Sequence, residues 1–493
     1  MKKEKTDHIK INDIKTRWLD KKWGIFFLVA VSIFMSTLDS SIVNVALPYM
    51  MQDLGTDIQT IQWVVLLYLT IVSSLLLTFG RLSDIKGRKL IYILGFTVFV
   101  VGSFFCGMAG VPWVLILSRA VQGCGAAMLM ACSPALIVDA FPVQTRGKAL
   151  GMIGAVVAAG LTTGPVVGGF LLDYFSWRYI FYINIPIGIA ASLGAMVILK
   201  NVHAPQQTPE PMDKKGGLLL IAIISSLIVF LTQVSDQGLF SVFSICMFGT
   251  FIFATIAFVL IETRIDYPLF DFSLLKIKLF LFPVISSGIL FAALFVIVFL
   301  MPFYLTYPCG FSASKTGSVM VVPFLFLIVV SPISGIMYDS WGSRKICMIG
   351  MSLLALSLVF LTTLSPSMGV ASILWRFALA GIGTALFISP NNTAIMNSVP
   401  LARRGIASGA VATARNLGMV LGVALAGLVF TRSFLSLTHG AGLENYLHNM
   451  ESFFMISFKR TMGMGFLLAL IGLFVTFLWG KEPRNIIKKE ELP

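Results

Sequence analysis

About fourteen long apolar runs occupy most of the chain, and they restrict what it can fold into more than any other feature. A helix needs about 20 mainly apolar residues to cross a bilayer. The sequence therefore predicts an all-α integral membrane protein. The predicted spans are approximately 24–46, 60–80, 90–110, 113–138, 148–171, 179–199, 217–234, 239–261, 280–306, 316–338, 346–364, 371–396, 406–431 and 460–480.

The composition agrees with a bilayer as the solvent. Charged residues make up 12% of the chain, whereas soluble domains carry about twice that share. The net charge of +14 could indicate a nucleic-acid partner, but the basic residues lie in short runs between apolar segments, so we expect none. The six cysteines are scattered and form no pattern typical of a disulfide framework or a zinc site, so we expect no metal.

The distribution of Lys and Arg predicts the orientation. An even number of spans places both termini on one side of the membrane. Of the 36 basic residues, 28 fall on that side, 5 on the opposite side and 3 within spans. Because loops rich in Lys and Arg stay in the cytoplasm, we expect a multi-pass protein of the plasma (inner) membrane with both termini cytoplasmic. The basic tail 1–22 is expected to lie along the membrane surface.

The sequence also repeats itself. The loop GRLSDIKGRK (80–89) recurs as GIMYDSWGSRK (335–345), and later matches keep nearly the same spacing. This spacing covers eight spans, which predicts two homologous six-span halves with two further spans inserted between them. The expected divisions are an N-terminal tail 1–22, a first half 23–200, a linker with the inserted helices 201–265, a second half 266–480 and a C-terminal tail 481–493.

The repeated loop follows the second span of each half. Its ordered glycines and charges indicate a gating role, since a short charged loop can bridge helix ends; a loop that only sets the topology is the simpler alternative. The segment DAFPVQTR, at the end of span four, offers a carboxylate and an arginine as partners. The candidate gating residues are Gly80, Arg81, Asp84, Gly87, Arg88, Asp139, Arg146, Asp339 and Arg344.

Two charged residues lie inside predicted spans of the first half. Arg119, in LSRAVQGCGAA, must face protein or water, because an arginine in hydrocarbon costs at least a few kcal/mol. Asp39, in STLDSSIVNVALP, is the carboxylate expected near it, and burial of an acid favours its protonated form. Asp39 is therefore a candidate for binding a proton or a cationic substrate. The alternatives are a buried structural ion pair for Arg119 and, for Asp39, hydrogen bonds to Ser40, Ser41 or Asn44.

The segment GLTTGPVVGG (160–169), in span five, combines glycines with a proline. Gly160, Gly164 and Gly168 share one helix face, which allows two membrane helices to pack backbone to backbone. Pro165 removes a hydrogen bond and is expected to kink or loosen the helix. Together with Gly169 these residues are a candidate joint between moving helices; a generic packing face is the alternative.

These motifs resemble the fourteen-span drug:proton antiporter family of the major facilitator superfamily, over essentially the whole chain. The resemblance implies a major facilitator fold, with two six-helix halves plus two inserted helices. It also implies that the loop motif, joined by Asp139 and Arg146, closes the cytoplasmic side, and that Arg119 takes part in proton coupling. GxxxGPxxGG looks like the antiporter motif of exporters, which implies outward transport. The proton gradient would be the energy source, with no cofactor.

The second half departs from the first. Where the first half has its glycine motif, the second has ARNLGMVLGVALAG, without a Gly-Pro pair. Arg376 and Arg415 lie in or near spans, and each could pair with backbone carbonyls, with an acidic substrate group or with Asp39. Spans nine and ten carry no Asp or Glu, which weakens any prediction of divalent cationic drugs. The segment 432–460 is expected to be a long external loop, folded as a hairpin, an amphipathic helix or a solvated connector.

The sequence predicts a transporter and not an enzyme, because it contains no nucleophile–base or metal constellation and nothing that resembles a P-loop. The leading prediction is a proton-coupled antiporter that exports amphipathic drugs or toxic compounds by alternating access, with Asp39 as the carboxylate for proton or substrate. One alternative is a dedicated exporter of an endogenous lipid, fatty acid or metabolite. Another is a non-transporting membrane sensor or scaffold. We expect a monomer whose partners are protons, a small-molecule substrate and the bilayer.

Overall fold

The computed structural model describes residues 2–199, 213–238, 240–265, 272–400 and 404–480. Every element in these ranges is a helix, and fourteen helical segments are long and apolar enough to cross a membrane. Each of them overlaps one predicted apolar run. The prediction of an all-α membrane protein with fourteen spans is therefore confirmed.

The first half begins with the long helix α1 (Lys2–Asp53). Its other helices are α2 (Ile58–Ile61), α3 (Trp63–Lys86), α4 (Arg88–Met108), α5 (Pro112–Ala140), α6 (Val143–Tyr174), α7 (Tyr179–Tyr182) and α8 (Asn184–Ile198). The inserted pair is α9 (Lys214–Gln237) and α10 (Val242–Glu262). Side chains cap these two helices, because Asp213 accepts a bond from the backbone N–H of Gly216 and Ser241 from that of Ser244.

The second half begins with a short 3₁₀ turn, η1 (Phe272–Lys276). Its α-helices are α11 (Lys278–Thr306), α12 (Ala313–Met320), α13 (Val322–Trp341), α14 (Ser343–Thr362), α15 (Val370–Asn397), α16 (Arg404–Leu437) and α17 (Glu451–Phe477). Two further 3₁₀ turns, η3 (Leu443–Asn445) and η4 (His448–Met450), lie between the last two spans.

The repeated loop has the same backbone geometry in both halves. Gly87 separates α3 from α4 with φ 94°, and Gly342 separates α13 from α14 with φ 76°. Residues with a side chain avoid this region of φ, which explains why glycine stands at both positions. The sequence repeat is therefore also a structural repeat at this turn.

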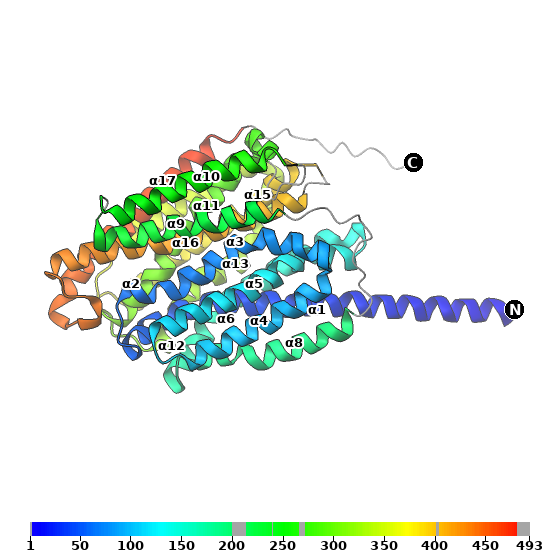
Figure 1. Cartoon of the computed structure of the whole chain (residues 1–493), viewed down its shortest axis with the longest axis horizontal. Coiled ribbons are helices and arrows are strands. Elements are labelled where there is room, and N and C mark those ends of the chain that lie inside the picture. The colour runs from blue at the N-terminus through cyan, green and yellow to red at the C-terminus, as the bar shows by residue number, and fades with distance from the viewer. Residues whose placement is uncertain (1, 200–212, 239, 266–271, 401–403, 481–493) are drawn as a thin grey trace.

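The two halves repeat the same helix pairs. In the first half α1 packs against α6, and α5 packs against α3 and α4. In the second half α11 packs against α16, and α15 packs against α13 and α14. The halves meet where α6 contacts α12 and α13, where α3 contacts α16, and where α1 contacts α11. The inserted helix α9 packs on both α3 and α16, so it lies alongside this junction (Figure 1).

Burial is uneven along the spans. We call the face of the bundle at which the span of α1 begins and α17 ends the tail face, and the opposite one the far face. The far-face parts of the central helices are buried at every position, namely residues 41–48 of α1 and 290–305 of α11. Residues 77–82, in the tail-face part of α3, keep partial accessibility. The central helices are therefore buried more completely toward the far face than toward the tail face.

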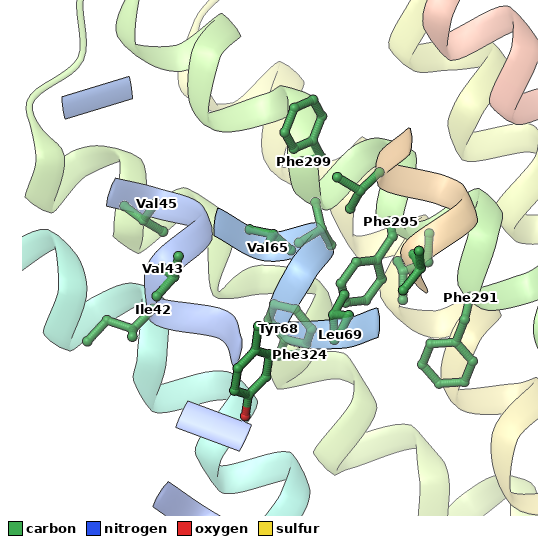
Figure 2. Packing of buried hydrophobic residues seen from close by; sticks show 14 of the residues in the cluster. Ile42, Val43, Val45, Val65, Tyr68, Leu69, Phe291, Phe295, Phe299 and Phe324 are labelled. Atoms are coloured by element: carbon green, nitrogen blue, oxygen red, sulfur yellow. The ribbon is translucent and has the colours of Figure 1, made fainter. Parts of the chain in front are cut away.

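Phenylalanines from α11 fill much of this packed centre. Phe291, Phe295 and Phe299 follow one another at four-residue spacing, so they form a row along one face of the helix (Figure 2). They belong to one cluster with Tyr68 of α3 and Phe324 of α13. The apolar core is thus shared by helices of both halves.

Two expectations about the chain outside the spans are wrong. Residues 2–21 continue α1 away from the bundle beyond its tail face, where the sequence suggested a tail along the membrane surface (Figure 1). The segment 432–460 is not one long loop, because α16 extends to Leu437 and α17 begins at Glu451. Lys459 and Arg460 lie in α17 as exposed residues, and Arg460 donates a hydrogen bond to Ser433 Oγ at 3.0 Å. Exposed charges near a helix end are compatible with a span.

Candidate functional site

Asp39 lies in the interior of the first half and is completely buried. Its Oδ2 is 2.5 Å from a terminal guanidinium nitrogen of Arg119, which is 1% exposed. Its Oδ1 accepts hydrogen bonds from Gln122 Nε2 at 2.8 Å and from Asn184 Nδ2 at 3.1 Å. The structure thus places together the two charged residues that the sequence singled out. It adds two amides that hold the carboxylate in place.

Arg119 connects three helices. From α5 it reaches Asp39 on α1, and its Nε donates a hydrogen bond to the carbonyl of Val64 on α3 at 3.0 Å. Its guanidinium also lies over the ring of Tyr68 on α3, 4.0 Å from the ring centroid, a geometry in which a cation is attracted to the aromatic face. A change in the hydrogen bonds of Arg119 would therefore alter the contacts of both α1 and α3.

Gln122 joins this network to α4. It lies one turn after Arg119, accepts a hydrogen bond from the guanidinium at 2.5 Å and donates to Ser103 Oγ at 2.9 Å. The sequence analysis did not select Gln122 or Asn184. The spacing of three residues from Arg119 was a usable signal for Gln122, since residues three apart share a helix face. Asn184 carried only the weaker signal of an amide in an apolar stretch.

The alternative partners suggested for Asp39 are wrong. Ser41 donates to the carbonyl of Leu38 at 3.0 Å, and Asn44 donates to the carbonyl of Ser40 at 2.7 Å. The hydroxyl of Ser40 donates to the carbonyl of Ser36. Each of these three side chains donates a hydrogen bond to a backbone carbonyl of its own helix. The carboxylate of Asp39 is bonded instead by Arg119, Gln122 and Asn184.

Arg88 is the centre of the charged loop at the tail face. It forms ion pairs with Asp84, at 3.2 Å, and with Asp139 of α5, and it also donates to the carbonyl of Ala135 at 3.2 Å. The contact between the loop and α5 expected from the sequence is therefore present and is made by Arg88. Arg146 does not contact these carboxylates, because its Nε donates to the carbonyl of Phe141 at 3.0 Å.

The equivalent loop of the second half has an amide where the first half has the carboxylate of Asp139. Asn397 occupies the position equivalent to Asp139 and donates to the hydroxyl of Tyr338 at 3.3 Å. Arg344 lies over the ring of Phe477, 4.8 Å from its centroid. The side chain of Asp339 lies outside the described part of the structure. The other two glycine positions, Gly80 and Gly335, are inside α3 and α13.

The glycine stripe of α6 packs directly against α1, as the sequence predicts. A Cβ atom at Gly160 would collide with Thr37, and one at Gly164 with Ser41; at Gly168 it would be 2.7 Å from Ile42 Cγ1. The close approach therefore requires glycine at these positions. α6 continues as one helix through Pro165.

The same helix joins the halves near the far face. A Cβ at Gly169 would be 2.5 Å from the carbonyl oxygen of Ala313, and one at Gly317 of α12 would collide with the carbonyl of Pro165. Asp173, at the end of α6, accepts hydrogen bonds from the backbone N–H groups of Ala313 and Ser314 at 3.0 and 2.9 Å. A carboxylate suits the N-terminus of α12, where backbone N–H groups lack helical partners. The sequence analysis missed Asp173, because its partner is brought close only by the fold.

A further bond between the halves lies at the far face, where Gln52 Nε2 donates to the hydroxyl of Tyr307 at 3.3 Å. Tyr307 follows α11 and contacts Tyr446 with ring centroids 5.2 Å apart. Burial raises the pKa of Tyr307 to about 12, so its hydroxyl stays neutral under physiological conditions. The far face is therefore closed by neutral and charge-assisted hydrogen bonds between the halves.

The two arginines of the second half differ from each other. Arg376 donates to the carbonyl of Phe360 at 2.8 Å, to the carbonyl of Ser372 at 2.5 Å and to Thr363 Oγ1 at 3.0 Å. It therefore follows the backbone-carbonyl alternative. Arg415 of α16 lies 5.9 Å from the ring centroid of Phe291, and its Nε is buried without a hydrogen-bond partner.

Two residue stretches of the chain, 29–423 and 283–490, match the family described as the Major Facilitator Superfamily. The chain belongs to this superfamily. The riboflavin transporter RibZ of Clostridioides difficile is 33% identical over 470 residues, which cover 95% of this chain and all of RibZ. The multidrug resistance protein Stp of Mycobacterium tuberculosis is 32% identical over 416 residues, covering 84% of this chain and 76% of Stp.

Solved transporters share the fold. A bacterial homologue of the human lysosomal transporter Spinster, inward-facing and unoccupied, superposes with a TM-score of 0.66 at 14% identity. The alignment covers 93% of this chain and 96% of that one. The superfamily match, the multidrug-resistance relatives and the fourteen spans agree with the fourteen-span drug:proton antiporter family. The protein is thus a multi-pass membrane transporter and not an enzyme.

Proposed function

We propose that this transporter exports amphipathic small molecules in exchange for protons, with Asp39 as the proton-binding carboxylate and Arg119 as its coupling partner. The observation that carries the proposal is the buried Asp39–Arg119 pair, with atoms 2.5 Å apart. Breaking such a pair leaves an uncompensated buried charge, which is strongly unfavourable. A proton that neutralises Asp39 therefore has a large effect on Arg119.

The position of the pair explains how one proton would act on the whole transporter. Arg119 is held by α1 through Asp39 and by α3 through Val64 and Tyr68. Both helices contact the second half, α1 against α11 and α3 against α16. Loss of the ion pair would loosen α1 relative to α3 at the junction of the halves. Protonation would thereby shift the populations of the two access states.

The proposed orientation places the tail face in the cytoplasm of a bacterial plasma membrane. The support is the excess of Lys and Arg in the loops on that side. In this orientation the far face, where hydrogen bonds join the two halves, lies on the outer side of the membrane. The loop around Arg88 would then lie at the cytoplasmic entrance. We further propose that the transporter works as a monomer without a cofactor.

The proposal is tested by transport in reconstituted liposomes under an imposed pH gradient. The probes are one cationic, one neutral and one anionic fluorescent amphipathic dye. The wild-type protein is expected to concentrate at least one of them against its gradient. The Asp39→Asn variant resembles the protonated carboxylate and is expected to lose this uphill transport. It is also expected to lose thermal stability, because Arg119 is left without its carboxylate, so transport is compared only for protein that elutes as folded. Full gradient-driven transport by Asp39→Asn would show that the proton site lies elsewhere.

A dedicated metabolite carrier is the second candidate, because RibZ, a riboflavin transporter, matches 95% of this chain. Riboflavin is therefore added to the same assay. Transport of riboflavin with no transport of any dye would favour a dedicated carrier. Absence of transport for all four compounds would favour the sensor or scaffold alternative.

A further inference from the structure

Three arginines lie inside predicted spans, and two of them have polar partners in the structure. Asp39 and Arg119 neutralise each other, and Arg376 is bonded to backbone carbonyls and a threonine. Arg415 has neither an ion pair nor hydrogen bonds of this kind. Within the part of the chain that the structure describes, it has no hydrogen bond and no carboxylate partner, and its Nε is a buried orphan donor. An unpaired cation at such depth is costly, so it calls for a partner that the chain itself does not provide.

Arg415 faces the interior of the bundle. None of the side chains from Ala407 to Thr431 on α16 is exposed, because α3, α9, α11, α15 and α17 all pack against this helix. Ser408, Ala412, Arg415 and Met419 are among the residues of α16 that keep partial accessibility. Gly409, on the same helix, lies against Leu77 of α3 from the other half. Arg415 is therefore a partly accessible residue of a helix that packs at the junction of the halves.

Phe291 gives this position an aromatic neighbour. The guanidinium carbon of Arg415 is 5.9 Å from the centroid of the Phe291 ring, at the tail-face end of the phenylalanine row on α11 (Figure 2). A planar guanidinium binds carboxylates and similar acidic groups through two parallel hydrogen bonds. A neighbouring ring accommodates an aromatic or apolar body. The two together suit a molecule with an acidic group at one end.

Asp39 cannot fill the corresponding role for cations in this conformation. It is completely buried, and both of its oxygens are occupied by Arg119, Gln122 and Asn184. Arg415 is therefore an arginine within the described spans whose charge has no carboxylate partner, whereas the carboxylate of Asp39 is already paired. The interior electrostatics favour anions.

We infer that Arg415 binds an acidic group of the substrate and that the preferred substrates are amphipathic organic anions with an aromatic or apolar body. This inference rests on the proposed function as a small-molecule transporter, and it specifies the substrate class. The acidic group of the substrate supplies the negative charge that balances Arg415. Arg415 is thereby a specificity-determining residue, separate from the proton site at Asp39.

The test compares two probes that differ only in charge. Pyrenebutyrate carries a carboxylate, and its primary amide is neutral with the same ring and chain. Binding to purified protein in lipid nanodiscs is followed by pyrene fluorescence at neutral pH. The wild-type protein is expected to bind the acid at least about tenfold more tightly than the amide, since hydrogen bonds to charged groups contribute about 1.5–3 kcal/mol.

Three variants separate a binding role from a structural one. Arg415→Gln is expected to lose about tenfold or more in affinity for the acid while the affinity for the amide changes less than about twofold. Arg415→Lys keeps the charge and is expected to recover part of the preference. Arg432→Gln removes an exposed arginine from the same helix and is expected to change neither affinity.

Equal losses for both probes in a folded Arg415→Gln variant would overturn the inference, because they would show a structural role. A wild-type protein that binds neither probe, or that prefers the amide, would also overturn it. Equilibrium binding needs no pH gradient, so this result is independent of proton coupling. Failure of Asp39→Asn to uncouple transport would leave the charge preference intact, and loss of the charge preference would leave the coupling proposal intact.

Discussion

Arg119 and Arg376 occupy matching positions in the two halves but stabilise their charges by different means. Arg119 pairs with Asp39 of α1, whereas Arg376 is bonded to carbonyl and hydroxyl oxygens. The reason is the neighbouring helix: the central part of α11, which corresponds to the region of Asp39 in α1, is an uninterrupted apolar run over residues 288–303 except for its glycine. Of these two matching arginines, the one in the first half is therefore paired with a carboxylate and the one in the second half is not.

Gln122 is expected to matter as much for stability as for transport. Replacement by Leu removes a donor to Asp39 and to Ser103, and an unsatisfied buried polar group costs about 1–3 kcal/mol. Gln122→Leu should therefore lower the thermal unfolding temperature by several degrees and reduce uphill transport. Ser118→Ala on the same helix is the control, because that hydroxyl bonds only its own helix, at the carbonyl of Val114. Unchanged unfolding in Gln122→Leu would contradict this account of the network.

The sequence was sufficient to find the charged members of the site but not the neutral ones. Asp39 and Arg119 stand out because charges are rare in apolar runs. Gln122 and Asn184 bond to Asp39 only because α5 and α8 pack close to α1 in the folded protein. The packing of these helices could not be predicted from the sequence. Arg415 was visible as an intramembrane arginine, but its lack of a partner follows only from the folded structure.

At the scale of elements, α6 packs against α1 of its own half and against α12 of the second half. One set of its glycines lies against α1, and Gly169 with Pro165 lies against α12. The sequence predicted that the glycine motif forms a close-packing face. It did not predict that α1 and α12 pack against this face. Span positions were predictable because hydropathy follows the spans directly. The sequence predicted that the last span begins near residue 460, whereas α17 begins at Glu451. The prediction was wrong because Lys459 and Arg460 interrupt the apolar pattern.

Gly317→Ala is expected to separate α6 from α12. The new methyl group would collide with the backbone carbonyl of Pro165, and backbone cannot rotate away as a side chain can. Overpacking of this kind costs about 1–3 kcal/mol, so the variant should lose thermal stability and transport activity. Gly154→Ala is the matched control on α6, since its Cβ would meet nothing within 4 Å. Equal behaviour of the two variants would refute the close-packing explanation.

Asp173→Asn is expected to weaken closure of the far face. The amide keeps one acceptor oxygen but presents N–H groups to a helix terminus that itself presents N–H groups. The readout is labelling of Gln62→Cys, in a cysteine-free background, by an impermeant maleimide added at the far face. Gln62 is 2% exposed and lies against Gly427 of the other half.

Labelling is expected to become at least about tenfold faster in Asp173→Asn, because a hydrogen bond to a charged group is worth about 1.5–3 kcal/mol. Asp53→Asn is the control. Asp53 is a carboxylate near the same face, but it binds Trp177 and Arg178 within the first half. The interpretation that Asp173 holds the far face closed fails if Asp53→Asn accelerates labelling as much as Asp173→Asn does.

At the scale of the whole molecule, the central helices are buried more completely toward the far face than toward the tail face. The halves are joined near the far face through Asp173 and through the Gln52–Tyr307 bond. The proton site lies in one half, next to helices that contact the other. Arg415 lies in the second half and is partly accessible. Proton and substrate would therefore bind at separate places and be coupled through the movement of the two halves.

The most direct test of the proposed exchange is substrate-driven proton movement. Liposomes containing the reconstituted protein receive a transported dye on one side only, with no initial pH difference, and a pH indicator follows the lumen. The wild-type protein is expected to move protons opposite to the dye. Asp39→Asn is expected to let dye flow down its gradient with no proton movement. Proton flux that persists in Asp39→Asn, or dye flow without proton flux in the wild-type protein, would contradict the account.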